Sequence, residues 1–591
     1  MQMKHDSLGA WVDRYRHAKH LSISQVCAAA QISRATYHRF VNGQADLTLH
    51  SVMTLLSMLS LELDELSDAL QAQLLPLDAA LQLVAQAQSD TTVDRQALVA
   101  WCQQQYWQSQ NPGFAQLVSV LAYFDQRANG ERRRAQATAT ALAQTLLTSR
   151  EWVSFDLRVM ALIATDLPWS LLQKSCWQRL TTCSVATTNP EAMAGIGQAY
   201  LKAALHQATT SAVHEACGWL HHLPLTANRL ANRALVHFAD LVDAVVVAGA
   251  DPKVMTNFKT HYHQLFGSAD WPHYAAMWQQ VLTTTFRQNV LVKPNQPKTP
   301  LTAVPELATV LRRIRRQRHL SVSALCQVAG ISRSTWQRVL QAPETARFST
   351  VMGICDSLRL NLSDLMALWQ PAQSQAHEWF AALAALPPQP ATIHAAVAQW
   401  QATYQRQWAK CAPTSVALLQ AAGAIVVAEV CQNRAQLELA VQQTWQQLNW
   451  LGEWTRFDYQ LLVPIIEYLD YPQVRLAFNR YLDLRKHGAS PLAAPIVDAL
   501  SCELVLCAWQ SADPQAIQAS LAAIEVLATR HHGENFVIGE HFAQLVCQKQ
   551  AQQDALATKH YQQVRAALRY FAPRAQDQAL IGMLDWLWHS L

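Results

Sequence analysis

The feature that most constrains this chain is an internal duplication. The twenty residues from His20 to Arg39 read HLSISQVCAAAQISRATYHR, and those from His319 to Arg338 read HLSVSALCQVAGISRSTWQR. Eleven of these twenty positions are identical, at a spacing of 299 residues. The segments 101–107 and 151–156 are echoed at 400–408 and 453–458, in the same order. The chain therefore consists of two tandem copies of one unit, each long enough for more than one domain.

Both copies are expected to be helical throughout. Within residues 192–206, 228–247 and 414–450, glycine and proline are sparse and apolar residues recur every three or four positions. No segment shows the sustained alternation of a strand. Aromatic residues at helical spacing, such as Trp152 and Phe155, are more typical of core packing than of ligand contacts.

The duplicated segment has the pattern of a helix-turn-helix. We expect a first helix over residues 8–19, a second helix capped by Ser22 or Ser24, and a third helix capped by Ser33. In this motif the last helix enters the major groove of DNA and directs its first residues toward the base edges. The pattern thus predicts two DNA-binding modules.

The fold class that follows is all-α, with two tandem copies of a helix-turn-helix domain followed by an α-helical repeat domain of stacked, tetratricopeptide-like helix pairs. A segment with four prolines and two lysines at 292–306 marks a linker between the copies. The expected divisions are 1–68 for the first helix-turn-helix domain, 69–290 for the first repeat domain, 291–304 for the linker, 305–368 for the second helix-turn-helix domain and 369–591 for the second repeat domain.

The DNA-contacting residues are predicted from their place at the start of each third helix and from their charge. Arginine can donate two hydrogen bonds to guanine O6 and N7. The net charge of +4 is small, so phosphate binding requires locally concentrated arginine, as in the five arginines between residues 312 and 318. The candidate residues are Ser33, Arg34, Ala35, Thr36, His38, Arg39 and Asn42 in the first copy, and Ser332, Arg333, Ser334, Thr335, Gln337 and Arg338 with Arg312, Arg315 and Arg316 in the second.

The same residues carry a resemblance to known regulators. The relevant stretches are KHLSISQV from Lys19, ISRATYHRFVNG from Ile32 and LLSMLSLELDEL from Leu55, with RHLSVSAL from Arg318, ISRSTWQRVL from Ile331 and LRLNLSDL from Leu358. Their order resembles the XRE (Cro/CI-like) helix-turn-helix, and more closely the Rgg/MutR family of Gram-positive transcription regulators. The resemblance implies an N-terminal DNA-binding domain, a helical repeat domain whose concave face binds a short signalling peptide, and action as a dimer.

The two copies differ at positions that matter for DNA. Ile23 and Val322 stand where such modules often have a glutamine that contacts phosphate. Within the third helix, three aligned positions differ between the copies: Ala35 with Ser334, Tyr37 with Trp336 and His38 with Gln337. After the helix, Asn42–Gly43 of the first copy is replaced by Gln341–Ala342, which precedes Pro343. We therefore expect unequal half-sites, hence an imperfect palindrome, and more phosphate affinity from the arginine-rich second module.

Other functional classes find little support. The twelve cysteines form no CxxC pair, His261 and His263 lack further ligands at a convincing spacing, and no P-loop, HExxH or dinucleotide fingerprint is present. We expect no enzyme activity, no cofactor and no metal. The N-terminus lacks a signal-peptide pattern, and the apolar runs are shorter than a membrane span, so a cytoplasmic location without membrane insertion is expected.

Two hypotheses remain open at this stage. The first is a sequence-specific transcription regulator in which two copies of a dimeric protein are fused into a covalent pseudo-dimer, monomeric or paired again as a homodimer, and controlled by a peptide or small ligand. The second is a protein-interaction scaffold whose helix-turn-helix modules no longer bind DNA. The altered turn at Ala342 and Pro343 favours the second hypothesis for the second module.

Overall fold

The computed structural model has an all-α architecture, as the sequence predicts. It describes residues 7–591 except 67, 89, 91, 150, 181–188, 224–229, 269–270, 288–305, 370–374, 409–411, 487–493, 531–536 and 572–577. Within this part of the chain there is no β-strand, and only two isolated bridges occur. The expected linker 291–304 lies outside the described residues.

Each copy begins with a compact helical module. The first contains α1 (Leu8–Ala18), α2 (Ile23–Ala30), α3 (Arg34–Val41), α4 (Leu49–Met58) and the short η1 (Leu63–Glu65). The second contains α17 (Leu307–Gln317), α18 (Val322–Val328), α19 (Arg333–Gln341), η5 (Pro343–Thr345), α20 (Phe348–Ser357) and α21 (Leu362–Trp369). We call these assemblies module 1 and module 2. The expected first helix, residues 8–19, differs from the observed one by a single residue.

The remainder of each copy is an array of consecutive helices that pack on their neighbours. Repeat domain 1 contains α5 (Asp68–Leu74), α6 (Pro76–Gln86), α7 (Arg95–Ser109), α8 (Pro112–Ala128), α9 (Arg132–Thr148), α10 (Ser154–Ile163), α11 (Trp169–Gln178), α12 (Pro190–Gln207), α13 (Thr210–Leu220), α14 (Leu230–Val246), α15 (Val254–Phe266) and α16 (Trp271–Thr283). Repeat domain 2 contains α22 (Gln375–Ala384), α23 (Ile393–Trp408), α24 (Pro413–Val430), α25 (Arg434–Trp450), α26 (Arg456–Leu462), α27 (Tyr471–Lys486), α28 (Ala494–Gln510), α29 (Pro514–Arg530), α30 (Val537–Gln550), α31 (Asp554–Phe571) and α32 (Gln578–His589).

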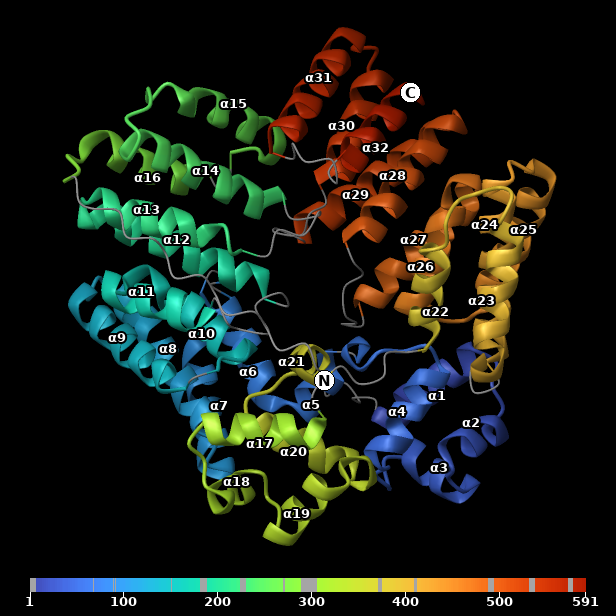
Figure 1. Ribbon diagram of the computed structural model, residues 1–591, viewed down its shortest axis with the longest axis horizontal. Coiled ribbons are helices and arrows are strands. Elements are labelled where there is room, and N and C mark those ends of the chain that lie inside the picture. Colours follow the sequence, from blue (N-terminus) through green and yellow to red (C-terminus); the bar gives the residue numbers. More distant parts are fainter. Residues whose placement is uncertain are drawn as a thin grey trace.

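The two arrays extend from the modules along opposite sides of the molecule and meet again at their far ends (Figure 1). There α15 of repeat domain 1 packs against α31 of repeat domain 2. The aromatic rings of Phe258 and Phe571 lie 5.5 Å apart at this contact, and those of His261 and Tyr570 lie 4.6 Å apart. Both modules lie at the opposite edge, with α3 and α19 on the outside (Figure 1).

Among the described residues, one helix is long and apolar enough to cross a membrane, which the sequence did not lead us to expect. It is α24, with 18 residues and a mean hydropathy of 1.5, and it is half buried within the protein. Leu418, Leu419 and Ile425 of this helix belong to the buried core of repeat domain 2. Packing inside the helical array therefore accounts for its apolar sequence.

Candidate nucleic-acid interface

The turn before each third helix is built by serine caps and a left-handed residue. The Ser22 hydroxyl accepts from the Gln25 amide and begins α2, and the Ser33 hydroxyl accepts from the Thr36 amide at 3.0 Å and begins α3. Between them Gln31 adopts a φ of 54°. Module 2 repeats this geometry, with Ser332 capping α19. Gly330 stands at the position of Gln31, and a glycine adopts the left-handed φ at lower conformational cost.

On both α3 and α19, one face of the helix is buried in its module and the opposite face is exposed. Tyr37 and Trp336 are almost fully buried, and the Tyr37 hydroxyl donates to Asp13 at 2.8 Å. The expectation that this unlike pair helps to distinguish half-sites is therefore wrong, because both residues belong to the module cores. The exposed residues are Arg34, Ala35, His38 and Arg39 on α3, and Arg333, Ser334, Gln337 and Arg338 on α19.

The first arginine of each exposed face is held by the preceding helix. The Arg34 guanidinium donates to the Ser24 hydroxyl at 2.5 Å, and Arg333 donates to the equivalent Ser323. These contacts direct both side chains across the turn while leaving them exposed. Thr36 and Thr335 are half-buried, and their hydroxyl groups bond the capping serines, so their contribution is to the shape of the turn.

The arginine run of module 2 divides into inward and outward residues. The Arg315 guanidinium donates to the Leu320 carbonyl, which duplicates the Arg16–Leu21 contact of module 1. Arg315 is therefore bonded to its own module's backbone, and its position does not support the predicted DNA contact. Arg312 is exposed and donates to the Leu340 carbonyl at 3.3 Å, and Arg316 is also exposed.

The two modules leave their third helices differently, as the sequence predicts. In module 1, Asn42 ends α3 and Gly43 follows with a φ of 70°. In module 2, Ala342 ends α19 with a φ of −149° and a ψ of 75°, and Pro343 opens the one-turn η5. The exposed Asn42, which follows α3, is thus matched by the exposed Gln341, which is still part of α19.

The modules pack directly on each other through the segments that precede α4 and α20. Backbone amides of Leu49 and Phe348 donate to the carbonyl groups of Ala346 and Leu47, both at 2.8 Å, forming an isolated antiparallel bridge. The Asp46 carboxylate also accepts from the Ser349 amide and hydroxyl at 3.1 and 2.6 Å. Equivalent segments of the two copies therefore meet at this contact.

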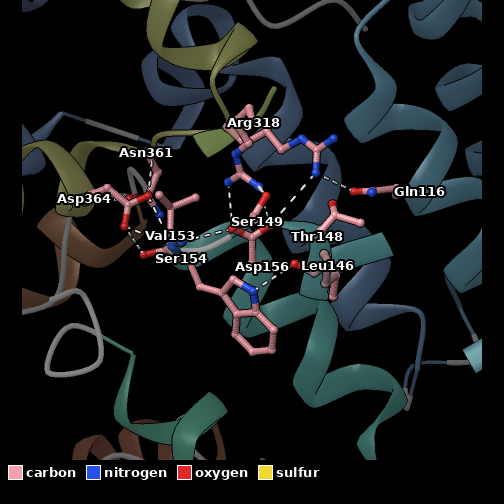
Figure 2. Close-up of polar contacts among 12 residues, drawn as sticks. Gln116, Leu146, Thr148, Ser149, Val153, Ser154, Asp156, Arg318, Asn361 and Asp364 are labelled. Carbon is pink, nitrogen blue, oxygen red and sulfur yellow. Dashed lines mark hydrogen bonds and ion pairs between the residues drawn. The ribbon is translucent and has the colours of Figure 1, made fainter. Parts of the chain in front are cut away.

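Each module also docks on the repeat domain of the other copy. We call the contact of module 2 with repeat domain 1 the second dock. Arg318 forks onto the Asp156 carboxylate with two 2.7 Å hydrogen bonds, and these side chains are 5% and 0% exposed (Figure 2). Asp156 additionally accepts from the Val153 amide, so the buried carboxylate also caps α10 (Figure 2).

Asp364 of module 2 adds a second buried carboxyl group to the second dock. Its carboxyl group accepts from the Ser154 amide at 3.0 Å and the Ser154 hydroxyl at 2.5 Å (Figure 2). Burial raises the pKa of Asp364 to about 7, against the lowering effect of these hydrogen bonds. Burial also lowers the pKa of the neighbouring Arg359 to about 9, with the Arg318 charge acting in the same direction.

The first dock joins module 1 to repeat domain 2 through equivalent positions. The Lys19 ammonium donates to the Asp458 carboxylate, and both side chains are fully buried. Arg456 of repeat domain 2 pairs with Glu62 at 2.7 Å and Asp64 at 3.4 Å. Burial raises the pKa of Glu65, which accepts from the Arg456 amide, to about 7.

The docking residues are the functional contacts that sequence reasoning missed. Their signal was present in the repeated segments 151–156 and 453–458, which end in Asp156 and Asp458. The aromatic residues of this pattern favour a role in packing, and Trp152 and Trp454 are indeed buried. The acidic residue at the end of each segment is what binds the opposite module.

No metal-binding cluster of histidine, cysteine or acidic residues occurs in the described part of the chain. The ring of His261 faces Gln264, and His263 bonds the Gly267 carbonyl. The ten cysteines that the structure describes are free thiols, mostly buried.

Comparison with known proteins agrees with this geometry. A family model for the Cro/C1-type HTH DNA-binding domain matches residues 12–70 and 310–370. These ranges include the turn and the third helix of both modules. A comparison with curated protein sequences gives no match. The chain therefore contains two helix-turn-helix domains of the DNA-binding Cro/C1 type.

Proposed function

Because the chain carries two Cro/C1-type DNA-binding domains, we propose that it is a cytoplasmic, sequence-specific transcription regulator that acts as a covalent pseudo-dimer. The observation that carries this proposal is the direct packing of the two modules through equivalent segments, Asp46–Leu49 and Ala346–Ser349. A dimeric helix-turn-helix protein places its recognition helices on half-sites about one DNA turn, roughly 34–36 Å, apart. One chain with two joined modules can meet this requirement alone.

The exposed residues of α3 and α19 support an imperfectly palindromic operator. Arg34 and Arg39 have exact counterparts in Arg333 and Arg338, which favours similar contacts in both half-sites. His38 faces outward where the other module has Gln337. We therefore propose two half-sites that share the bases read by arginine and differ at the bases near this pair.

The experiment is selection of genomic DNA fragments, including the region upstream of the gene, by the purified protein and by Arg34→Ala, Arg333→Ala and the double variant. Each substitution is expected to cost about 1–3 kcal/mol and to relax specificity in one half-site only. Arg434→Ala is the matched control, because this exposed arginine lies on α25, in repeat domain 2.

Weak binding without sequence preference, equal for the wild type and the double variant and lost as salt rises, would contradict the proposal. In that case the scaffold function becomes the better explanation. A discrete imperfect palindrome that is enriched only by proteins with at least one intact module would support the proposed regulator. Binding is compared at low and near-physiological salt, since phosphate contacts alone weaken steeply over that range.

We further propose that a short peptide or another small ligand bound by the repeat domains controls DNA binding. The two docks support this idea, since each module rests on a repeat domain that belongs to the other copy. A ligand that prefers one arrangement of the helices shifts the population of docked modules. If no peptide from the host's culture medium changes DNA affinity or thermal stability, this part of the proposal fails.

A further inference from the structure

A pocket of about 740 Å³ lies between the two DNA-binding modules. One wall is α4 of module 1, with His50 and Met53, and the other is formed by module 2. The module 2 wall contains Glu306 before α17, Leu340 near the end of α19, and Trp369 at the end of α21. This volume is within the range of about 300–1,000 Å³ that is typical of small-molecule sites.

The contact between the modules is asymmetric, and the pocket lies on the side with fewer contacts between the two modules at these positions. On the opposite side of that contact, the Asp46 carboxylate bonds the amide and hydroxyl of Ser349. The positions equivalent to this pair are Thr345 and His50. The Thr345 hydroxyl instead donates to the Ala342 carbonyl at 2.8 Å, within its own turn. The Asp46 contact therefore has no counterpart on the side that holds the pocket.

Two carboxylates that module 1 lacks line this pocket. Glu306 and Glu344 occupy the positions of Ser7 and Ala45. Ser7 caps α1 and donates to the Val41 carbonyl, whereas the Glu306 side chain makes no capping hydrogen bond to α17. Among the described residues that line the pocket there is no lysine or arginine.

We propose that this pocket binds a small organic cation, an amine with an aromatic or aliphatic body. The ammonium group is placed near Glu306 and Glu344, and the apolar body against Met53, Leu340 and Trp369. Carboxylates at the rim give the charge selectivity, and an indole ring favours an adjacent cation through its π-face. Since the walls belong to different modules, an occupant also fixes the position of α19 relative to α4.

The test measures binding without DNA, so that its outcome does not depend on the proposed regulatory function. Phenethylamine, tryptamine and agmatine are titrated into the full chain by isothermal calorimetry, together with saturation-transfer NMR of the ligands. Two control compounds match phenethylamine in size: 2-phenylethanol is neutral, and phenylacetate is an anion. We expect at least one amine to bind, and phenethylamine to bind at least tenfold more tightly than its two analogues.

The variant Glu306→Gln/Glu344→Gln separates this pocket from other surfaces. Both residues are exposed, so the protein should fold normally, and amine affinity should fall at least tenfold. The control is Glu131→Gln/Glu438→Gln, which removes two carboxylates outside the pocket. Absence of binding by all three amines, equal binding of phenethylamine and its analogues, or unchanged affinity in the pocket variant would overturn the proposal.

Discussion

The substitution Arg318→Met tests whether the second dock depends on its buried ion pair. Arg318 and Asp156 are 5% and 0% exposed, and the guanidinium satisfies both carboxylate oxygens at 2.7 Å. Methionine retains an apolar side chain but removes the charge. The Asp156 carboxylate then stays buried with the Val153 amide at 3.0 Å and the more distant Arg359 at 3.9 Å.

Removal of one partner from a buried ion pair costs about 3–5 kcal/mol. The two contacts that Asp156 keeps place the expected cost at the lower end, about 3 kcal/mol, which increases the opening equilibrium roughly 150-fold. Unfolding of a chain with several domains is not a two-state process, so the assay must report local opening. Hydrogen exchange followed by mass spectrometry on peptides from α10 and α17 measures it directly.

Two further variants decide whether the ion pair is the cause. Arg434→Met removes a pair with Glu438 in which the side chains are 91% and 61% exposed, and it should change local exchange by less than about 0.5 kcal/mol. Arg318→Met/Asp156→Asn removes the orphaned charge and should recover most of the lost protection. An Arg318→Met protein whose exchange at α10 and α17 rises less than threefold would refute the reasoning.

Three other predictions concern packing, pH and thiol reactivity. Gly9→Ala places a Cβ 2.0 Å from the Phe40 carbonyl oxygen, so the α1–α3 contact must open at a cost of about 1–3 kcal/mol in thermal unfolding. The control Gly353→Ala places its Cβ 3.9 Å from the Ala329 carbonyl oxygen, an ordinary contact distance, and should not destabilise the protein. The pKa of Asp364 is raised to about 7 in the docked state, so this state binds an extra proton and docking should weaken as pH rises from about 4 to 7. Hydrogen exchange of α21 should show this pH dependence in the wild type and not in Asp364→Asn. Absence of the dependence in the wild type, or its persistence in the variant, contradicts the assignment. Among the described cysteines, exposed Cys547 should react first with a thiol reagent, and mass mapping that finds buried cysteines labelled earlier would contradict this.

The modules could be predicted from sequence because their signals are local. A serine cap, a left-handed position and a short helix are encoded within about ten residues, so Ser22 and Ser33 predict nearly correct helix starts in module 1. Charge alone was less informative. The pattern does not reveal that Arg315 bonds its own backbone while Arg316 is exposed, because that depends on the fold around α17.

The crossed docking could not be predicted for a physical reason. A module could dock on its own repeat domain or on that of the other copy. Both arrangements bury the same types of side chain, and they differ mainly in the path of the connections. The duplication makes the two possibilities equivalent in sequence pattern, because Lys19 and Arg318 are matched residues, as are Asp458 and Asp156. Only the three-dimensional arrangement distinguishes Lys19–Asp458 from a pairing within one copy.

The pocket between the modules also depends on tertiary structure. Glu306 and Glu344 are 38 positions apart in sequence, and their neighbours do not form a recognisable binding motif. Sequence comparison of the two copies does show that both carboxylates replace uncharged residues of module 1. It does not show that they line one cavity with His50, since that residue lies in the other module.

The two docks use charge differently, which has consequences for their response to salt. Each dock contains a buried ion pair, Lys19–Asp458 in the first and Arg318–Asp156 in the second. The first dock adds Arg456 with Glu62 and Asp64, and these side chains are 18%, 11% and 24% exposed. In the second dock the uncharged Ser154 stands at the position of Arg456. Screening acts most strongly on charges that solvent reaches. Added salt should therefore loosen module 1 from repeat domain 2 more than module 2 from repeat domain 1. Since salt also weakens phosphate contacts, the salt dependence of DNA binding by this chain reflects module release as well as counterion release, and Arg456→Met should reduce the former contribution alone.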